Sequence, residues 1–208
     1  MSSYFDGAAS TWDGEPRRVA LAKAVGEAIQ QCARPTKAMD MLEYGAGTGL
    51  VSLYLLPHVR SVVSADNSPG MLEILQNKLT HGRLEHIKVM LLDLEKQPVP
   101  PERYDLIVTS MAMHHVAETD KVLRAFHALL RPGGVVCIAD LDTEPGLFHD
   151  DEVAKGVHHR GFERAKLKQQ LGETGFHDMV DVTAHTIHKP VERGQERAFP
   201  IFLITARR

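Results

Sequence analysis

The sequence predicts a doubly wound α/β fold, because short apolar runs alternate along the chain with amphipathic stretches of helical period. Two features are typical of the edge of such a sheet that binds ligands: a glycine-rich segment after the first apolar run and an acidic residue at the end of the second. The chain has 208 residues, 43% of them hydrophobic and 25% charged, which suits one well-cored domain. We expect a mostly parallel sheet of about seven strands, with an antiparallel C-terminal strand and an N-terminal helical cap.

The N-terminal cap is a predicted helix that follows an irregular start at residues 1–14. Pro16 suits a first helical position, and apolar residues then recur at helical spacing as far as Pro35. The apolar runs beyond it predict parallel strands at Ala38–Glu43, Ser61–Asp66, Ile87–Leu92, Tyr104–Ser110 and Gly134–Leu141. Helices are predicted between them at Gly49–Leu56, Ser68–Leu79 and Thr119–Leu130.

The last third of the chain has a different pattern. One more helix is predicted at Gly161–Thr174, and two strand-like runs follow it at Asp178–His188 and Phe199–Ala206. Polar residues that include Pro190 and Gly194 join these two runs. A hairpin at this point predicts an antiparallel addition to one edge of the sheet.

Composition and charge exclude several classes of protein. The net charge of −3 and the pI near 6.4 give no positive field for nucleic acid or anionic lipid. The longest apolar runs are too short to cross a membrane, and the first residues lack the pattern of a signal peptide. Cys32 and Cys137 fit reduced, buried thiols. We therefore expect a soluble, cytoplasmic protein with no nucleic-acid or membrane partner.

The glycine-rich segment carries three glycines, at 45, 47 and 49, which allow positive φ angles and a close approach of backbone N–H groups to a ligand. A dinucleotide fingerprint would need a third glycine at position 50, which is Leu50, and no Gly-Lys-Ser/Thr follows for a phosphate loop. Glu43 would repel a pyrophosphate but suits the ammonium and sulfonium of S-adenosylmethionine. Asp66 can accept hydrogen bonds from both hydroxyls of a ribose, which nicotinamide cofactors also contain.

Several segments together carry a family resemblance, which extends over about residues 38 to 141 and more weakly to the C-terminus. They are Glu43–Gly49, Asp66–Leu72, Leu92–Leu94, Tyr104–Val108, Met111–Val116 and Leu130–Gly134. In them the chain resembles the class I, seven-stranded methyltransferases, of the type that acts on small molecules. The resemblance implies S-adenosylmethionine as methyl donor and S-adenosylhomocysteine as product.

The resemblance also assigns residues to the cofactor. Glu43 and the glycine turn would hold the methionine end, Asp66 the ribose, and Asp93 the adenine amino group. Capping of a turn is the structural alternative for Asp93. The full set expected at the cofactor is Glu43, Gly45, Ala46, Gly47, Gly49, Asp66, Asn67, Met71, Asp93, Leu94, Ser110 and Met111.

The acceptor is expected beyond the carboxyl ends of the strands. His114 is the tentative catalytic residue, as a base for an oxygen or nitrogen acceptor, and His115 is its neighbour. Packing against the cofactor or capping of the next helix is the alternative for His114. A second pair, His158 and His159, is assigned tentatively to an acceptor pocket or to a solvated loop. With His149 nearby it raises the question of a metal, but the spacing fits no known ligand pattern, so we expect none.

The aromatic N-terminus is expected to act as a lid, with Tyr4 and Trp12 as its tentative contacts. A disordered leader with Trp12 packed on the body is the alternative. We divide the single domain of residues 1–208 into three parts: a lid and helix at 1–34, a cofactor-binding core at 38–141, and an acceptor-side loop, helix and hairpin at 142–208.

The expected function is methyl transfer to a small-molecule acceptor, with catalysis mainly by positioning. The acceptor and its accepting atom stay open, and the assembly is expected to be a monomer or homodimer. Two rivals are a non-catalytic protein that binds S-adenosylmethionine and a nicotinamide-dependent oxidoreductase. Leu50, Glu43 and the lack of a Tyr-x-x-x-Lys pair count against the oxidoreductase.

Overall fold

The computed structural model describes residues 2–149, 151–190 and 196–208. Its sheet has seven strands in the order β3-β2-β1-β4-β5-β7-β6. The strands are β1 (Asp40–Tyr44), β2 (Ser61–Asp66), β3 (Ile87–Leu91), β4 (Tyr104–Ser110), β5 (Leu130–Leu141), β6 (His177–Pro190) and β7 (Glu196–Arg207). The first five pair in parallel, and β7 is antiparallel to both of its neighbours. The predicted fold class is confirmed.

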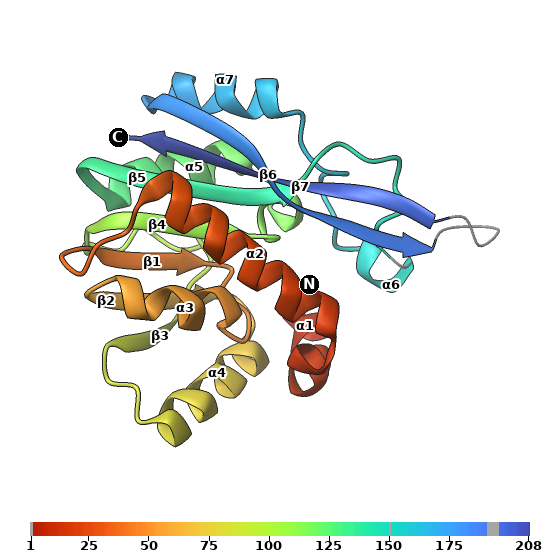
Figure 1. Cartoon of the computed structure of the whole chain (residues 1–208), viewed down its shortest axis with the longest axis horizontal. Helices are drawn as coiled ribbons and strands as arrows, with labels where there is room; N and C mark the ends of the chain where they lie inside the picture. Colours follow the sequence, from red (N-terminus) through yellow and green to blue (C-terminus); the bar gives the residue numbers. More distant parts are fainter. Residues whose placement is uncertain (1, 150, 191–195) are drawn as a thin grey trace.

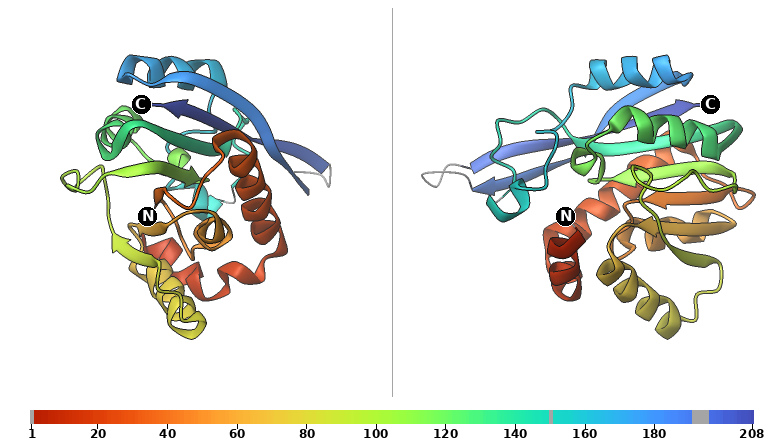
Figure 2. Two further views of the ribbon diagram at one scale, coloured as in Figure 1. Left: turned by 60° about the vertical axis from the view of Figure 1, so that its left-hand side comes forward. Right: turned by 180° about the vertical axis from the view of Figure 1, so that it is seen from behind.

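Helices cover both faces of the sheet, as Figure 1 and the view from behind in Figure 2 show. They are α1 (Ser2–Ala8), α2 (Pro16–Ala33), α3 (Leu50–Leu55), α4 (Pro69–Gly82), α5 (Thr119–Leu129), α6 (Asp151–Ala154) and α7 (Arg164–Thr174). Short 3-10 turns lie at Ala9–Gly14, Leu56–His58 and Met113–His115. Of the sequence predictions, the strands at Ser61–Asp66 and Tyr104–Ser110 match to the residue.

The period of two along each strand divides the core into two layers. Met41 and Leu106 face the layer that contains α2, α3 and α4, whereas their neighbours Leu42 and Ile107 face the layer that contains α5 and α7. The strands are apolar on both sides because both faces are covered. This arrangement directs the carboxyl ends of β1, β2 and β4 toward one edge of the sheet.

The amino ends of the strands carry a charged network that serves the fold. Asp105, at the start of β4, accepts the backbone N–H of Asp40 at 2.8 Å and pairs with Arg131 at 2.5 Å. Asp40 also pairs with Arg60, which holds the pKa of the Asp40 carboxyl well below its usual range. Asp105 therefore stabilises the start of β4 against β1.

The N-terminal segment corrects one expectation. Residues 1–14 were predicted to be irregular, but α1 and the turn Ala9–Gly14 are helical. Because their sequence has no apolar period, tertiary contacts must stabilise these turns. Asp6 accepts hydrogen bonds from Ser68 Oγ at 2.6 Å and from the N–H of Gly70 at 2.9 Å, at the start of α4. Gly70 allows this approach, since a Cβ there would lie 2.9 Å from Asp6 Cα.

The C-terminal hairpin is longer than predicted on both strands, and its outer half extends past the parallel sheet in Figure 1. Gly194 of its connection lies outside the described residues. Cys32 and Cys137 are both free thiols. Cys137 is buried, which raises its pKa, whereas Cys32 is only half-buried, so the expectation of two buried thiols is wrong for Cys32. Within the described ranges, no helix combines the length and the apolar character that a bilayer crossing requires.

Candidate active site

The glycine-rich turn follows β1 directly and is fixed by the neighbouring strand. The backbone N–H groups of Gly45 and Ala46 donate to the carbonyl of Ala65 at 2.8 and 3.0 Å. Gly45, Gly47 and Gly49 all have positive φ, which side-chain-bearing residues rarely adopt. A Cβ at Gly45 would lie 2.3 Å from Cβ of Ala112, so this glycine also lets the segment after β4 pass close to the turn.

Asp66 ends β2 and closes the turn from the side. Its carboxylate accepts the N–H of Gly47 at 2.7 Å and the N–H of Ser68 at 2.8 Å. Burial raises the pKa of the Asp66 carboxyl, and the N–H donors, that of Gly47 first, oppose this shift. Each oxygen keeps a lone pair for a further donor.

Glu43 lies next to this turn and is 2% exposed. Its carboxyl accepts a hydrogen bond from Ser52 Oγ, which also lies 2.6 Å from Ser64 Oγ. Burial raises the pKa of Glu43 to about 8, since a hydroxyl partner compensates only part of the lost hydration. Within the described ranges, neither Glu43 nor Asp66 has an ion pair with a cationic side chain.

The opposite wall comes from the segments after β3 and β4. Asp93 accepts a hydrogen bond from the N–H of Glu95 at 3.0 Å and pairs with Lys96 at 2.8 Å. These contacts are the ones expected if Asp93 caps a turn, which was the alternative to binding of the adenine. Met111 has a φ of 55°, and its N–H donates to Ala139 at 2.9 Å. Between these walls lies a cleft of about 380 Å³.

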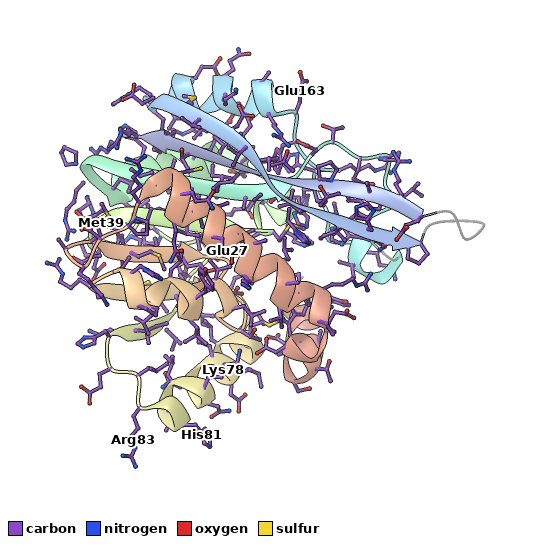
Figure 3. All side chains as sticks on the ribbon, in the orientation of Figure 1. Glu27, Met39, Lys78, His81, Arg83 and Glu163 are labelled. Carbon is purple, nitrogen blue, oxygen red and sulfur yellow. The ribbon has the colours of Figure 1, made fainter. Side chains whose placement is uncertain are left out.

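The N-terminal segment covers the cleft. Phe5, Trp12 and Arg18 line it, and the Arg18 guanidinium lies 3.6 Å from the centroid of the Trp12 ring. Asp13 anchors the segment: it accepts Thr48 Oγ1 at 2.5 Å and pairs with Lys78, which is labelled on α4 in Figure 3. The lid assignment stays a proposal, and this placement supports it.

We expect Asp13→Ala to loosen the covering segment without unfolding the chain. Loss of its two contacts should cost about 1.4 kcal/mol and raise the open population about tenfold. Limited trypsin digestion, followed by mass spectrometry, should then show faster cleavage at Arg17 and Arg18. Glu27→Ala is the matched control, because it removes only an exposed pair with Lys23 on the same helix. Equal cleavage rates in Asp13→Ala and in the unaltered chain would show that this anchor does not hold the segment.

Three histidines gather beside the cleft. His114 is 1% exposed, and its Nδ1 lies 2.6 Å from Asp140 Oδ1, so this nitrogen donates to the buried carboxylate. Its Nε2 lies 3.1 Å from Nε2 of His149, which comes from the loop after β5. His115 directs Nδ1 to the carbonyl of Gly156 at 3.0 Å. Burial, together with the proximity of His114, lowers the pKa of His115 to about 4 and that of His149 to about 3, so both are uncharged at neutral pH.

A second cavity, of about 250 Å³, adjoins these histidines. Phe5, Trp12, Arg18, Leu21, Met111 and His115 line both this cavity and the cleft. Tyr4, Phe148 and Lys189 are among the residues that line the second cavity but not the cleft. The two cavities therefore share one boundary, formed by the N-terminal segment and the segment after β4.

The structure brings most of the predicted site residues into the cleft. These are Glu43, Gly45, Ala46, Gly47, Asp66, Asn67, Met71, Asp93, Ser110 and Met111, together with Trp12, His115 and His158. Tyr4 and His114 line the second cavity. Three lie elsewhere. Gly49 packs under Leu75, Leu94 is in the core with its N–H donating to the Tyr44 hydroxyl at 3.3 Å, and His159 lines a separate hollow with Phe162.

Other lining residues had no assignment from the sequence. Phe5 belongs to the aromatic N-terminal segment that was expected to act as a lid, so the sequence indicated it indirectly. Arg18 and Leu21 were predicted only as residues of a helix. Asp140 and His149 were missed as partners of His114, because their contacts depend on the folding of distant segments.

This strand order, with an antiparallel seventh strand and a glycine turn at the carboxyl edge, defines the Rossmann-like fold of the class I methyltransferases. Residues 42–138 match a family described as methyltransferase domain. Over these residues the chain is therefore similar to the class I, S-adenosylmethionine-dependent methyltransferases, and it has their fold.

Two curated relatives show the extent of the similarity. An uncharacterised methyltransferase of Schizosaccharomyces pombe is 35% identical over 138 residues, which cover 60% of this chain and 48% of that protein. A demethylmenaquinone methyltransferase of Clavibacter sepedonicus is 30% identical over 152 residues, which cover 70% and 59%. The chain thus spans about half the length of the curated relatives it matches.

Among solved structures, the complex of DhpI with S-adenosylhomocysteine superposes with a TM-score of 0.73. The alignment covers all of this chain and 94% of that one at 21% sequence identity, a level that shows the fold alone.

Proposed function

We propose that the chain binds S-adenosylmethionine in the cleft and transfers its methyl group to a small-molecule acceptor in the adjoining cavity. One observation carries the proposal: two carboxyl groups, the buried Glu43 and the half-buried Asp66, line the same cleft beside a glycine turn, and neither has an ion pair with a described cationic side chain. Buried acids of this kind are costly unless a ligand compensates them. The ammonium, the sulfonium and the ribose hydroxyls of the cofactor are suitable partners.

The space beside the turn fits the same ligand. A Cβ at Gly47 would meet nothing closer than the sulfur of Met71 at 4.0 Å, so the backbone at this position faces open cleft. Glu43 would hold the cationic methionine end, and Asp66 would accept the ribose hydroxyls while it keeps Gly47 in place. Asp93 would reach the adenine only if its contact with Lys96 opened.

The bound cofactor supplies a methyl group on a positively charged sulfur, which an acceptor atom attacks in line. The chain's own contribution is to align the partners and to exclude water. Phe5 and Met111 lie on the boundary between the two cavities, where they would position the acceptor. His114, oriented by Asp140, has its Nε2 as the basic nitrogen and is the residue that could accept a proton.

Glu43 gives cofactor binding a predicted pH dependence. Its pKa near 8 leaves the carboxyl mostly protonated at pH 7 in the free protein, and a bound ammonium favours the carboxylate. Binding at pH 7 should therefore release a proton, and affinity should rise between pH 6 and pH 8 and then level off. Isothermal titration in two buffers of different ionisation enthalpy measures this proton. Glu43→Gln should abolish the release, whereas equal heats in both buffers for the unaltered chain would contradict the assignment.

The same shift affects folding with a defined sign. Because the folded pKa lies above the ordinary value of 4.5, the contribution of Glu43 to the free energy of unfolding is fully present below about pH 4.5. It is lost as the pH rises through about 8. Bound cofactor should reduce this loss, since it stabilises the ionised form.

Methyl transfer itself is tested by screening small molecules for release of S-adenosylhomocysteine. An acceptor that raises the release well above the rate without acceptor supports the proposal. Undiminished turnover in His114→Ala on such an acceptor would exclude the proton-accepting role of that residue. Cofactor binding with no release on any acceptor would favour a non-catalytic binding protein.

A further inference from the structure

The histidines beside the cleft have an arrangement that acid–base chemistry alone does not require. Two come from the turn Met113–His115 after β4, and the third, His149, lies 35 residues beyond His114. One ring nitrogen from each of the three lies within 4.8 Å of the others. A single proton acceptor would need one imidazole and its orienting partner, so the other two are unexplained by that role.

Two of the three imidazole rings are oriented by a hydrogen bond at Nδ1. The Nδ1 of His114 donates to Asp140, and the Nδ1 of His115 faces the carbonyl of Gly156. In each ring Nε2 then keeps its lone pair, which is the form that binds metal. A carboxylate or carbonyl behind a histidine is the usual support of a metal ligand, because it fixes the tautomer and raises the basicity of the ring.

The spacing also suits a metal. Ligand nitrogens about 2.0–2.1 Å from a tetrahedral zinc ion lie roughly 3.3 Å apart. The Nε2 atoms of His114 and His149 are 3.1 Å apart, and a ring nitrogen of His115 lies within 4.8 Å of the ligand nitrogens of both. A hydrogen bond between the two Nε2 atoms could also give this distance, but it leaves His115 without a role.

We propose that His114, His115 and His149 bind a divalent transition-metal ion of the zinc type, with Asp140 as the positioning residue behind His114. Uncharged imidazoles suit zinc, and three protein ligands leave a fourth position open. That position would face the second cavity, which all three histidines line. A metal ion on Nε2 of His114 would occupy the lone pair that a proton acceptor needs, so metal binding would replace the base role of this residue. The proposal does not depend on the cofactor, and its failure would leave the proposed methyl transfer intact.

The test is a zinc titration of the chelator-treated chain without cofactor. We expect one zinc ion per chain and a loss of at least about 100-fold in affinity in His149→Gln, which comes from a half-buried loop. Asp140→Asn should weaken binding by about 10- to 100-fold, as second ligand-shell changes do. His81→Ala is the matched control, because His81 is exposed on α4, where Figure 3 labels it, and should bind zinc like the unaltered chain.

Cobalt(II) gives a second readout that does not depend on affinity. Bound at the three histidines, it should show the intense visible bands of tetrahedral coordination, and His115→Gln should lose them while the metal-free chain still melts cooperatively. Absence of zinc binding by the unaltered chain would overturn the proposal. Equal affinity in His149→Gln would also overturn it, because the ion would then be bound elsewhere.

Discussion

Replacement of Asp66 by alanine is expected to weaken binding of S-adenosylmethionine by about 100-fold. The carboxylate accepts the N–H groups of Gly47 and Ser68, so its removal loosens the turn and also leaves the ribose hydroxyls without a charged acceptor. Hydrogen bonds to a charged group are worth about 1.5–3 kcal/mol each, and about 3 kcal/mol in total corresponds to 100-fold. Isothermal titration with the cofactor measures the change.

Two further variants separate binding from folding. Asp66→Asn keeps the shape and one acceptor oxygen, so its affinity should lie between those of the unaltered chain and Asp66→Ala. Glu173→Ala removes an exposed acid on α7 and should bind normally. Unchanged affinity in Asp66→Ala, in a chain that still melts cooperatively, would show that this carboxylate does not hold the ribose.

Gly47→Ala is expected to have an effect of similar size for a different reason. The added methyl group would enter the open cleft beside the turn, where we propose that the methionine part of the cofactor binds, and overlap there should cost up to about 3 kcal/mol of binding, or on the order of 100-fold. The positive φ of Gly47 adds a strain of about 1 kcal/mol to the folded chain. Titration should therefore show a large loss of affinity, and thermal melting only a small loss of stability.

Gly133→Ala is the control for this strain. Gly133 also has a positive φ, a Cβ there would meet nothing within 4 Å, and it lies outside the cleft. It should lose a similar amount of stability and keep its affinity. If both variants bound the cofactor equally well, the cleft beside Gly47 would not be the binding site.

The sequence predicted the sheet well, because strands covered on both faces are apolar throughout and glycines and prolines separate them. It did not predict the helical N-terminal segment, since contacts of Asp6 and Asp13 with α4 and its surroundings stabilise that segment rather than an apolar period. The lengths of the two hairpin strands were also underestimated, because the residues at their ends are mostly polar and exposed.

The site residues that form a local sequence pattern were predicted, whereas contacts between distant segments were not. Glu43, Gly47 and Asp66 form a local pattern at strand ends, and all three line the cleft. Leu94 was assigned to the cofactor site because it follows Asp93 in the sequence, but its side chain is buried in the core. The contact of His114 with His149 joins two segments whose spacing follows no pattern, so only the folded chain shows it.

The most direct test of the account is a titration of the chain with S-adenosylhomocysteine and, separately, with NAD. We expect saturable binding of one S-adenosylhomocysteine per chain, which Gly47→Ala lowers on the order of 100-fold and Gly133→Ala leaves unchanged, and no measurable binding of NAD. Tight binding of NAD without a signal from S-adenosylhomocysteine would contradict it.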